Sequence, residues 1–456
     1  PNRVRFCAHH HAHAAAAFLP SGFADAAVLV VDGVGEWATT SLWRGRDGKL
    51  EPLSEQLFPD SLGLFQSALT QYLGFEPEKD EHKLEALAAY GTPRFADRLL
   101  EVVRLEPHGV ISIDPAPFRF RFDGDLLFGP GLVELLGPVR IPGGPLDTSG
   151  GDSRFVDVAA SVQEVLERAL LHLAKHAHEV VGSPRLCVGG CLALNATALG
   201  RLHSEGPFDE LFVESLAHDG GAALGAALLS ASMHGPVRTR DDDWIGLGDE
   251  VRLVAEETPG LEREDAPGRL EARVAEALEA GALVGYVRGR SAWSPDALGR
   301  RSLFGDPRRA DARRALNDRV ARRDPFLPLR AVTTCEAAAR FFEVPDGADA
   351  ALRGGSLVLR ARPETVESLP AVVHANGTAR VQVVDARTQP GLHRLLSAFD
   401  ARTGVALLAE ADLAVRGEPP VRGAHEALQL FERTDLDLLV LEDRLLERAR
   451  AGVTPS

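Results

Sequence analysis

Runs of apolar residues alternate with amphipathic stretches along most of the 456-residue chain. Short, continuous apolar runs bounded by turn residues predict buried strands at 26–31, 185–191 and 283–287. Longer stretches with an apolar residue every three or four positions predict helices, of which 155–181 is the longest. Because strands and helices alternate in this order, the sequence predicts an α/β fold.

Changes in composition along the chain predict its division into domains. Residues 236–266 shift to charge, glycine and proline, and are the best candidate for a linker. A chain of this length is long for one hydrophobic core, so we expect two domains, at 1–240 and 265–456. Residues 105–150 are rich in proline, glycine and aspartate, which favours a loop-dominated insert. Core packing alone explains the apolar face of the helix at 155–181.

The overall composition narrows the class of protein. A formal net charge of -16 and an isoelectric point near 5.4 argue against a nucleic-acid or acidic-membrane partner and favour a soluble enzyme. No apolar run is long enough to span a bilayer and no signal peptide opens the chain, so we expect a cytoplasmic protein. The four cysteines form no CxxC pair, which fits a reducing compartment. The chain begins at Pro1 without a methionine, which suggests a truncated, processed or partly observed product.

Four histidines lie within five consecutive positions near the start of the chain, and an alanine run follows them. If this run continues as a helix, His9 and His13 stand one turn apart on the same face, where two imidazoles can chelate one metal ion. Histidine nitrogen suits Zn, Fe or Ni, so a third ligand and the metal's identity stay open. A solvated polar helix start is the simpler alternative. A purification-tag remnant does not fit, because alanines interrupt the histidines.

Glycine-bearing turns follow three of the apolar runs. Their residues are Asp32, Gly33 and Gly35, then Gly189, Gly190 and Asn195, then Asp219 and Gly220. A strand followed by glycines and a helix N-terminus forms a ready anion site. Each turn is a weak signal alone, and an Asp-Gly turn also suits a hairpin, which a returning strand at 39–43 supports. Together they resemble the phosphate-clasping turns of a duplicated α/β nucleotide-binding fold.

A longer series of motifs, in order along nearly the whole chain, carries a resemblance to a known family. The first block runs from His9 to Gly91 and contains Val31-Asp32-Gly33-Val34-Gly35-Glu36, Ser61-Leu62-Gly63-Leu64 and Tyr72-Leu73-Gly74-Phe75. The later motifs are Ala193-Leu194-Asn195, Asp219-Gly220, Gly289-Arg290, Ala297-Leu298-Gly299, Arg301-Ser302, Asp306-Pro307-Arg308 and Val415-Arg416-Gly417-Glu418-Pro419. Through them the chain resembles the O-carbamoyltransferases, which include the nodulation-factor carbamoyltransferases and the enzymes that carbamoylate tobramycin, cephamycin and ansamycin antibiotics.

The resemblance implies two domains and a two-step activity. The first domain would have an actin-like (ASKHA) fold, bind an iron ion, and transfer carbamoyl from carbamoyl-adenylate to a hydroxyl of a small-molecule natural product. The second would be a YrdC-like α/β domain that makes the adenylate from ATP and carbamoyl phosphate. Carbamoyl transfer develops negative charge on the carbonyl oxygen and on the leaving phosphate, and a cation and helix N-termini would stabilise both.

Matching positions imply roles for single residues. The implied metal ligands, for Fe(II) or for Zn in its place, are His9, His13 and Asp219, and with Lys83 they form the implied catalytic set. The implied nucleotide-binding residues are Asp32, Gly33, Gly35, Asn195, Gly220, Arg290, Arg301, Ser302 and Arg416.

Departures from the family pattern concentrate in the second domain. The family's Glu-Phe-Gly-Pro-Arg before Ala-Leu-Gly reads Ala292-Trp293-Ser294-Pro295-Asp296, and its Asn-Thr-Ser-Phe-Asn before Val-Arg-Gly-Glu-Pro reads Ala409-Glu410-Ala411-Asp412-Leu413. A basic residue and an arginine of its phosphate-facing stretch read Ala321 and Leu327. Acids where a triphosphate must sit repel it by Coulomb's law, so we expect an eroded ATP site. The family's N-terminal segment, with the first strand of the actin-like fold, has no counterpart in the sequence.

Three interpretations stay open. The first is a complete O-carbamoyltransferase, in which neighbouring arginines take over the phosphate contacts; the candidates are Arg290, Arg301, Arg308, Arg322 and Arg323. The second is a catalytically incomplete subunit that forms a homo- or hetero-oligomer with a complete family member. The third is a relative of the hydrogenase-maturation carbamoyltransferases, which the lack of their acylphosphatase and zinc-finger modules disfavours.

Overall fold

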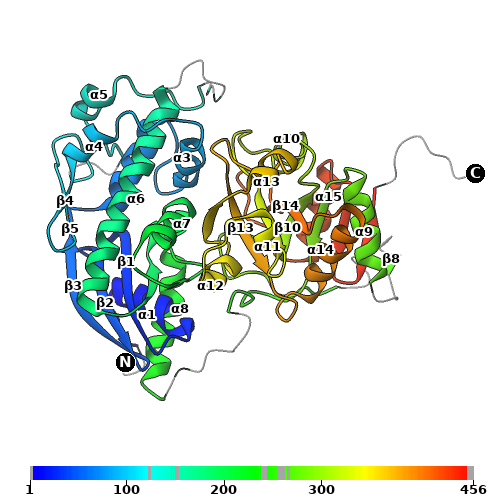
Figure 1. Cartoon of the computed structure of the whole chain (residues 1–456), viewed down its shortest axis with the longest axis horizontal. Coiled ribbons are helices and arrows are strands. Elements are labelled where there is room, and N and C mark those ends of the chain that lie inside the picture. Colours follow the sequence, from blue (N-terminus) through cyan, green and yellow to red (C-terminus); the bar gives the residue numbers. More distant parts are fainter. Residues whose placement is uncertain are drawn as a thin grey trace, which may run out of the picture. The chain divides into compact units, whose positions relative to one another are not determined.

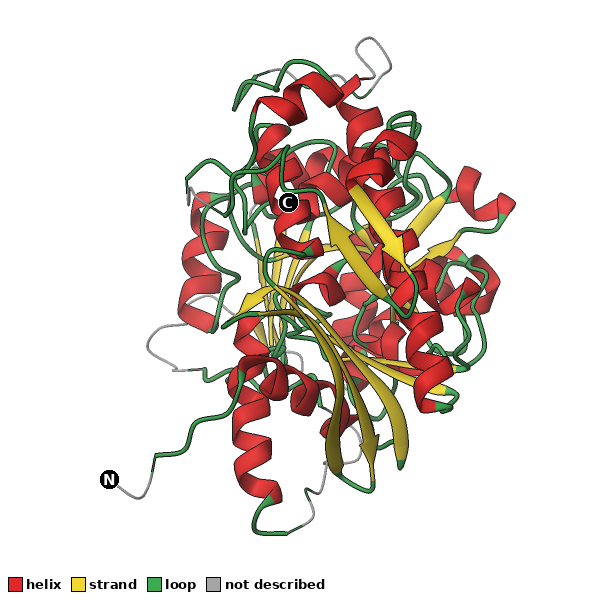
Figure 2. Ribbon diagram, turned by 90° about the vertical axis from the view of Figure 1, so that its left-hand side faces the viewer, coloured by secondary structure: helices red, strands yellow, loops and turns green. Residues whose placement is uncertain are grey.

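The computed structural model of the chain (Figure 1) describes residues 4–121, 125–144, 146, 148, 154–235, 237, 244–253, 262–263 and 268–448. The chain divides into two compact units, residues 1–239 with 345–359 and residues 240–344 with 360–456. Helices pack around strands in both (Figure 2), which confirms the predicted α/β class. The predicted domain boundaries at 240 and 265 lie outside the described residues. Among the described helices, none has the length and apolar character needed to cross a membrane.

A five-stranded sheet in the order β3-β2-β1-β6-β7 forms the centre of the first unit. β1 (Asp25–Gly35), β2 (Ala38–Arg46) and β3 (Lys49–Leu57) form an antiparallel meander. β6 (Arg185–Gly189) runs parallel to β1, and β7 (Glu210–Val213) runs parallel to β6. The apolar run of β1 is buried on both faces, which is why it is continuous rather than alternating. The carboxyl ends of β1, β6 and β7 therefore meet at one edge of the sheet.

Helices pack on this sheet. α1 (His9–Phe18) packs on β1 and β6 and lies beside α8 (Asp219–Ser232), as Figure 1 shows. The long amphipathic α6 (Arg154–Val181) packs on β1 and against α3 (Glu81–Ala88) and α7 (Ala196–Glu205). The other described helices and strands of the unit are α2 (Leu62–Tyr72), α4 (Ala96–Val102), α5 (Pro130–Leu136), α12 (Asp349–Arg353), β4 (Val103–Glu106) and β5 (Val110–Ile113).

The segment 345–359 belongs to the first unit although the sequence places it among elements of the second. α12 in this segment packs on β7. His203 Nε2 lies 3.0 Å from the carbonyl oxygen of Asp346, and a Cβ at Gly200 would be 2.1 Å from the carbonyl oxygen of Val358. These contacts join the segment to α7, so the first unit is discontinuous in sequence.

The second unit is built on a sheet that contains β13-β11-β14-β10-β9-β15-β16-β8 in that order. These strands are β8 (Glu262–Arg263), β9 (Val284–Val287), β10 (Arg301–Gly305), β11 (Arg330–Thr334), β13 (Thr378–Val384), β14 (Leu407–Asp412), β15 (Leu438–Leu441) and β16 (Arg444–Glu447). The helices are α9 (Arg269–Glu279), α10 (Ala312–Ala315), α11 (Ala338–Phe341), α13 (Pro363–Ser368), α14 (Pro390–Thr403) and α15 (Ala424–Arg433), and β12 (Leu357–Arg360) follows α12. The apolar faces of α9 and α14 meet over the sheet, where Val274, Leu278 and Phe399 are fully buried with Phe304.

Part of the predicted linker packs on the second unit. The amide of Gly248 donates to the carbonyl oxygen of Ser291 over 3.0 Å, and the amide of Ser291 donates to Asp249 over 2.8 Å. Residues 244–253 are therefore held by backbone hydrogen bonds, and most of the remaining residues of the 236–266 linker lie outside the described residues.

Candidate metal centre

The helix α1 presents two imidazoles at the carboxyl edge of the first unit's sheet. It begins at His9, whose amide donates to both carboxylate oxygens of Glu36 over 3.2 and 3.3 Å, so Glu36 takes the capping role that the methyl side chain of Ala8 cannot fill. The helical spacing brings the Nε2 atoms of His9 and His13 to 3.0 Å from each other. The predicted i,i+4 histidine pair is therefore present.

Asp32 enters this site from the carboxyl end of β1. Only 4% of the residue is exposed. Its Oδ2 atom lies 3.1 Å from His9 Nε2 and 3.3 Å from His13 Nε2. Its Oδ1 atom accepts hydrogen bonds from the amides of Gly33 (2.9 Å) and Cys191 (3.1 Å), which fix the orientation of the carboxylate. Both carboxylate oxygens of Asp32 are thus engaged.

Asp219, the first residue of α8, completes the group. Its side chain is 81% exposed, and its Oδ1 atom lies 3.3 Å from His9 Nε2 and 3.9 Å from His13 Nε2. The helix is capped by the preceding His218, whose Nδ1 atom accepts the amide hydrogen of Gly220 over 3.0 Å. The sequence matched Asp219 to a metal ligand, and the structure places it beside both histidines.

The four side chains form a donor set that fits one divalent cation. One ligand atom from each of His9, His13, Asp32 and Asp219 lies within 4.8 Å of all the others. Ligand atoms about 2.1 Å from a metal ion lie roughly 3.0 Å apart at neighbouring octahedral positions and roughly 3.4 Å apart at tetrahedral ones. The closest separations in the group, from 3.0 to 3.3 Å, match these values. Two imidazoles with carboxylates suit Fe(II) or Zn.

The electrostatics of the group favour a bound cation. Burial opposes ionisation of Asp32, yet hydrogen bonds from His13 and His9 outweigh it and hold the pKa of its carboxyl well below the usual range. The hydrogen bond with Asp32 raises the pKa of His9 against the opposing effect of burial. The site thus stabilises positive charge next to an ionised carboxylate. A bound metal ion would supply that positive charge.

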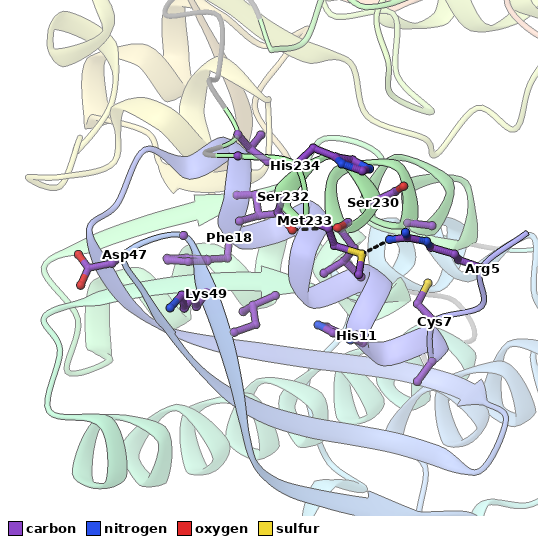
Figure 3. Close-up of a pocket in the computed structure, with 18 of the residues that line it drawn as sticks. Arg5, Cys7, His11, Phe18, Asp47, Lys49, Ser230, Ser232, Met233 and His234 are labelled. Carbon is purple, nitrogen blue, oxygen red and sulfur yellow. Dashed lines mark hydrogen bonds between the residues drawn. The ribbon is translucent and has the colours of Figure 1, made fainter. Parts of the chain in front are cut away.

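The opposite face of α1 borders an open hollow. His11 points away from the metal ligands and stacks on Trp43, with ring centroids 5.0 Å apart. The hollow has a volume of about 1810 Å³ and is lined by the N-terminal segment, α1, the β2–β3 turn and the end of α8 (Figure 3). Phe6 and Met233, both largely exposed, border it. A substitution of His11 is therefore a matched control for substitutions of His9 and His13, the two histidines of the candidate metal site.

The predicted nucleotide-loop residues of the first unit have varied surroundings. A Cβ at Gly35 would be 2.4 Å from His9 Cδ2, so a glycine is needed there for the approach of the metal ligand. A Cβ at Gly33 would contact nothing within 4 Å, so there is free space beside this residue, whereas a Cβ at Gly220 would lie 2.9 Å from His218 Cε1. Asn195 is buried, caps α7 through the amide of Ala198, and exchanges two hydrogen bonds with Gln163.

Lys83 lies on α3 and forms an ion pair with Asp80 at 3.0 Å. Its side chain is 12% exposed, and its ammonium group also lies 5.7 Å from the centroid of the Phe75 ring. The structure therefore gives Lys83 local partners in the segment between α2 and α3, and its predicted catalytic role stays a prediction.

Arg301, predicted to bind phosphate, forms hydrogen bonds with the backbone of the second unit. All five of its N–H groups donate to backbone carbonyl oxygens, which belong to Arg422, Arg288, Arg300, Asp249 and Gly289. Burial lowers its pKa to about 10. A phosphate could bind Arg301 only if some of these hydrogen bonds were broken.

The other predicted residues of the second unit are divided between buried and exposed positions. Ser302 is fully buried and donates to Glu410 Oε1 over 2.5 Å. Arg290 donates to the carbonyl oxygens of Gly246 and Leu247. Arg416 has a side chain that is 61% exposed and lies 3.7 Å from Asp324. Of these three, Arg290 and Arg416 are exposed to a ligand and Ser302 is not.

The acids that depart from the family pattern bind one buried arginine. The Arg330 guanidinium lies 2.5 Å from Asp296, 2.8 Å from Glu410 and 2.5 Å from Asp412. Asp296 also lies 2.6 Å from Arg380. Burial opposes ionisation of Asp296, but the charges of Arg330 and Arg380 lower its pKa to about 2. Two arginines distant in sequence, Arg330 and Arg380, thus pair with these acids, and the expected erosion of the ATP site stays a prediction.

Sequence reasoning assigned Asp32 to a nucleotide loop and missed its contact with the histidine pair. Its position after a buried strand was the available signal, since carboxyl ends of parallel strands gather binding residues. Glu36, the cap of α1, carried no sequence signal that separated it from other exposed acids.

Comparisons with known proteins identify the relatives of the chain. Two family models match it, the carbamoyltransferase N-terminus over residues 2–228 and the carbamoyltransferase C-terminus over residues 275–448. An uncharacterised protein of Synechocystis is 36% identical over 97% of this chain and 76% of its own length. The nodulation protein NolO of Bradyrhizobium diazoefficiens is 34% identical over 98% of this chain and 79% of its own length.

Two further matches are more distant. The 3'-hydroxymethylcephem-O-carbamoyltransferase of Amycolatopsis lactamdurans is 29% identical over 81% of this chain and 65% of its own length. Among solved structures, HypF of T. kodakarensis is 17% identical, with a TM-score of 0.26 over 50% of this chain and 36% of that one.

Proposed function

This chain belongs to the carbamoyltransferase family, and on that premise we propose that it transfers a carbamoyl group to a hydroxyl of a small-molecule natural product. The donor would be carbamoyl phosphate, by way of carbamoyl-adenylate, with the first unit adopting the actin-like ASKHA role. The observation that carries the proposal is the convergence of His9, His13, Asp32 and Asp219. A cephem O-carbamoyltransferase among its relatives supports an alcohol as acceptor.

A metal ion would be held by these four side chains, with Fe(II) as the proposed native ion and Zn as a substitute. When bound, it would act as a Lewis acid on the negative charge that develops during carbamoyl transfer. Asp32, whose Oδ1 atom accepts hydrogen bonds from the amides of Gly33 and Cys191, would present its Oδ2 atom to the ion beside the two imidazole Nε2 atoms. The turn at Gly33, which has free space where a side chain would stand, and the N-terminus of α8 would face the anionic leaving group.

The second unit, with the proposed YrdC-like role, favours a second candidate function. Of the arginines that were to take over the phosphate contacts, Arg301 has all five donors bound to carbonyl oxygens. Arg308 is paired with Asp306 at 2.6 Å, and Arg323 binds Asn317 and the carbonyl oxygen of Pro328. These contacts support a transferase that forms little adenylate itself and receives it from a complete family member, as a homo- or hetero-oligomer.

One pair of assays tests both candidates on the full chain. Pyrophosphate release from ATP that depends on carbamoyl phosphate reports adenylate formation. AMP release from carbamoyl-adenylate, generated by a complete carbamoyltransferase, reports the transfer half and should rise with a hydroxyl acceptor. We expect AMP release in wild type, its loss in His13→Ala, and its retention in His11→Ala.

The outcomes separate the candidates. Pyrophosphate release by the chain alone would favour a complete enzyme. Its absence alongside AMP release would favour the incomplete subunit. If His13→Ala released AMP at the wild-type rate, the proposal that the first unit performs metal-assisted carbamoyl transfer would be wrong.

A further inference from the structure

A buried acid that the proposed reaction does not use lies at the same sheet edge as the candidate metal centre. Glu214 directly follows β7. The parallel strands pair Val30 with Gly189 and Val188 with Val213, so the next row places Glu214 beside Gly189. Asp32 lies two residues beyond Val30 on β1. Glu214 therefore stands two rows below the metal ligand, at the edge where α8 begins.

The carboxyl of Glu214 holds the turn that leads into α8. Only 3% of the residue is exposed. Its Oε1 atom accepts the amide hydrogen of Leu216 over 2.9 Å. Its Oε2 atom is buried without a hydrogen-bond partner among the described residues. A Cβ at Gly221 would be 2.5 Å from this Oε2 atom, so the carboxyl lies against the first turn of α8.

The turn is closed tightly around this side chain. The same Cβ at Gly221 would be 2.1 Å from the carbonyl oxygen of Leu216, so the turn and the helix both crowd position 221. Asp219 lies between the two points that Glu214 contacts. Moving the carboxyl would therefore move the backbone from which the Asp219 side chain projects.

Burial of this acid is costly, which argues for a role. Desolvation raises the pKa of Glu214 to about 7, against the hydrogen bond from Leu216. An apolar side chain of similar size would avoid that cost. Buried acids with strongly displaced pKa values gather at functional sites.

We propose that Glu214 is a positioning residue for the metal centre, which sets the location of Asp219 relative to His9 and His13 by holding the turn before α8. The proposal rests on the proposed metal site. It predicts that the shape and hydrogen-bond acceptor of the Glu214 side chain decide the affinity for a divalent cation, although Glu214 does not touch the ion.

The test is calorimetric titration of Zn²⁺ alone into the metal-free full chain. Glu214→Gln keeps an acceptor for Leu216 and should bind Zn²⁺ within about threefold of wild type. Glu214→Leu keeps the volume without the acceptor and should bind at least about tenfold more weakly, which is within the range found for residues that support ligands. Glu167→Gln, at a partly buried acid of α6, is the control and should match wild type.

Circular dichroism and thermal unfolding establish that each variant is folded. If Glu214→Leu does not fold, Glu214→Asp carries the same prediction, because it withdraws the carboxyl from Leu216 and Gly221 by one methylene. Wild-type Zn²⁺ affinity in whichever of these two variants folds, with or without a lowered melting temperature, would overturn the role of Glu214 alone. A wild-type chain that bound no Zn²⁺ would overturn the metal centre itself and this inference with it.

Discussion

Gly225 in α8 lies directly against Ala12 in α1, and a Cβ at position 225 would stand 1.8 Å from the carbonyl oxygen of Ala12. Ala12 lies between His9 and His13, and α8 begins with Asp219. The separation between the histidines and Asp219 therefore depends on a backbone contact that only glycine permits.

We expect Gly225→Ala to push α8 away from α1. Overpacking of this kind costs about 1–3 kcal/mol of unfolding free energy, and the displaced Asp219 should weaken metal affinity. Urea unfolding and Zn²⁺ titration measure the two effects. Gly129→Ala is the control, because its Cβ would meet no atom closer than 3.6 Å. Equal metal affinity in both variants would show that α8 does not need this spacing.

The metal content of single variants should follow the geometry of α1. His13→Ala and Asp32→Asn should each lose most of the bound metal, because the first removes a ligand and the second removes the carboxylate charge beside both imidazoles. His11→Ala should keep it, since His11 stacks on Trp43. Elemental analysis after purification with added Fe(II) or Zn²⁺ measures the difference. Unchanged metal in His13→Ala would refute the assignment.

Removal of the arginine at the centre of the second unit's acidic cluster should be strongly destabilising. In Arg330→Met, Asp296, Glu410 and Asp412 would lose their shared partner, and breaking such a buried group costs about 3–5 kcal/mol. Arg314→Met, at a side chain that is 85% exposed, should change stability by less than about 0.5 kcal/mol. Chemical unfolding of the full chain tests both, and comparable midpoints would contradict the prediction.

The stability of the chain should depend on pH through Glu214. Its pKa is raised from 4.5 to about 7 in the folded chain, so the folded state holds the proton more tightly than the unfolded state. The contribution of the Glu214 proton to the free energy of unfolding is then fully present below pH 4.5. It is lost as the pH rises through 7, and the total loss is roughly 3 kcal/mol. Unfolding free energies of wild type, measured from pH 5 to 8, should fall relative to those of Glu214→Gln. Parallel curves would mean that the folded-state pKa is near its ordinary value.

Local patterns in the sequence predicted the elements that local interactions determine. Ser61 directly precedes α2, and its hydroxyl accepts the amide hydrogen of Leu64, as the preference of serine for helix N-caps predicts. The spacing of His9 and His13 needed only a helix to bring them together. The place of Asp32 in the metal site was harder to predict, because phosphate turns and hairpins share the Asp-Gly-x-Gly pattern. Only the packing of α1 on β1 brings the Asp32 carboxylate to the imidazoles.

Interactions between distant residues account for what the sequence did not reveal. Asp296 and Asp412 read as charges that would repel a nucleotide, because Arg330 lies far from both along the chain. The nearby arginines read as spare cations, yet Arg301 donates only to backbone carbonyl oxygens. Whether a charge is paired depends on the fold, and no local pattern carries that information.

The discontinuous first unit has a consequence for the order in which the chain is made. A ribosome releases residues 1–239 before residues 345–359, and domains generally fold as their residues emerge. α12 packs on β7, the strand that precedes the Asp219 turn, so this edge of the sheet stays uncovered while residues 240–344 are synthesised. The nascent chain would therefore hold all four metal-ligand residues before the helix that covers β7 has emerged.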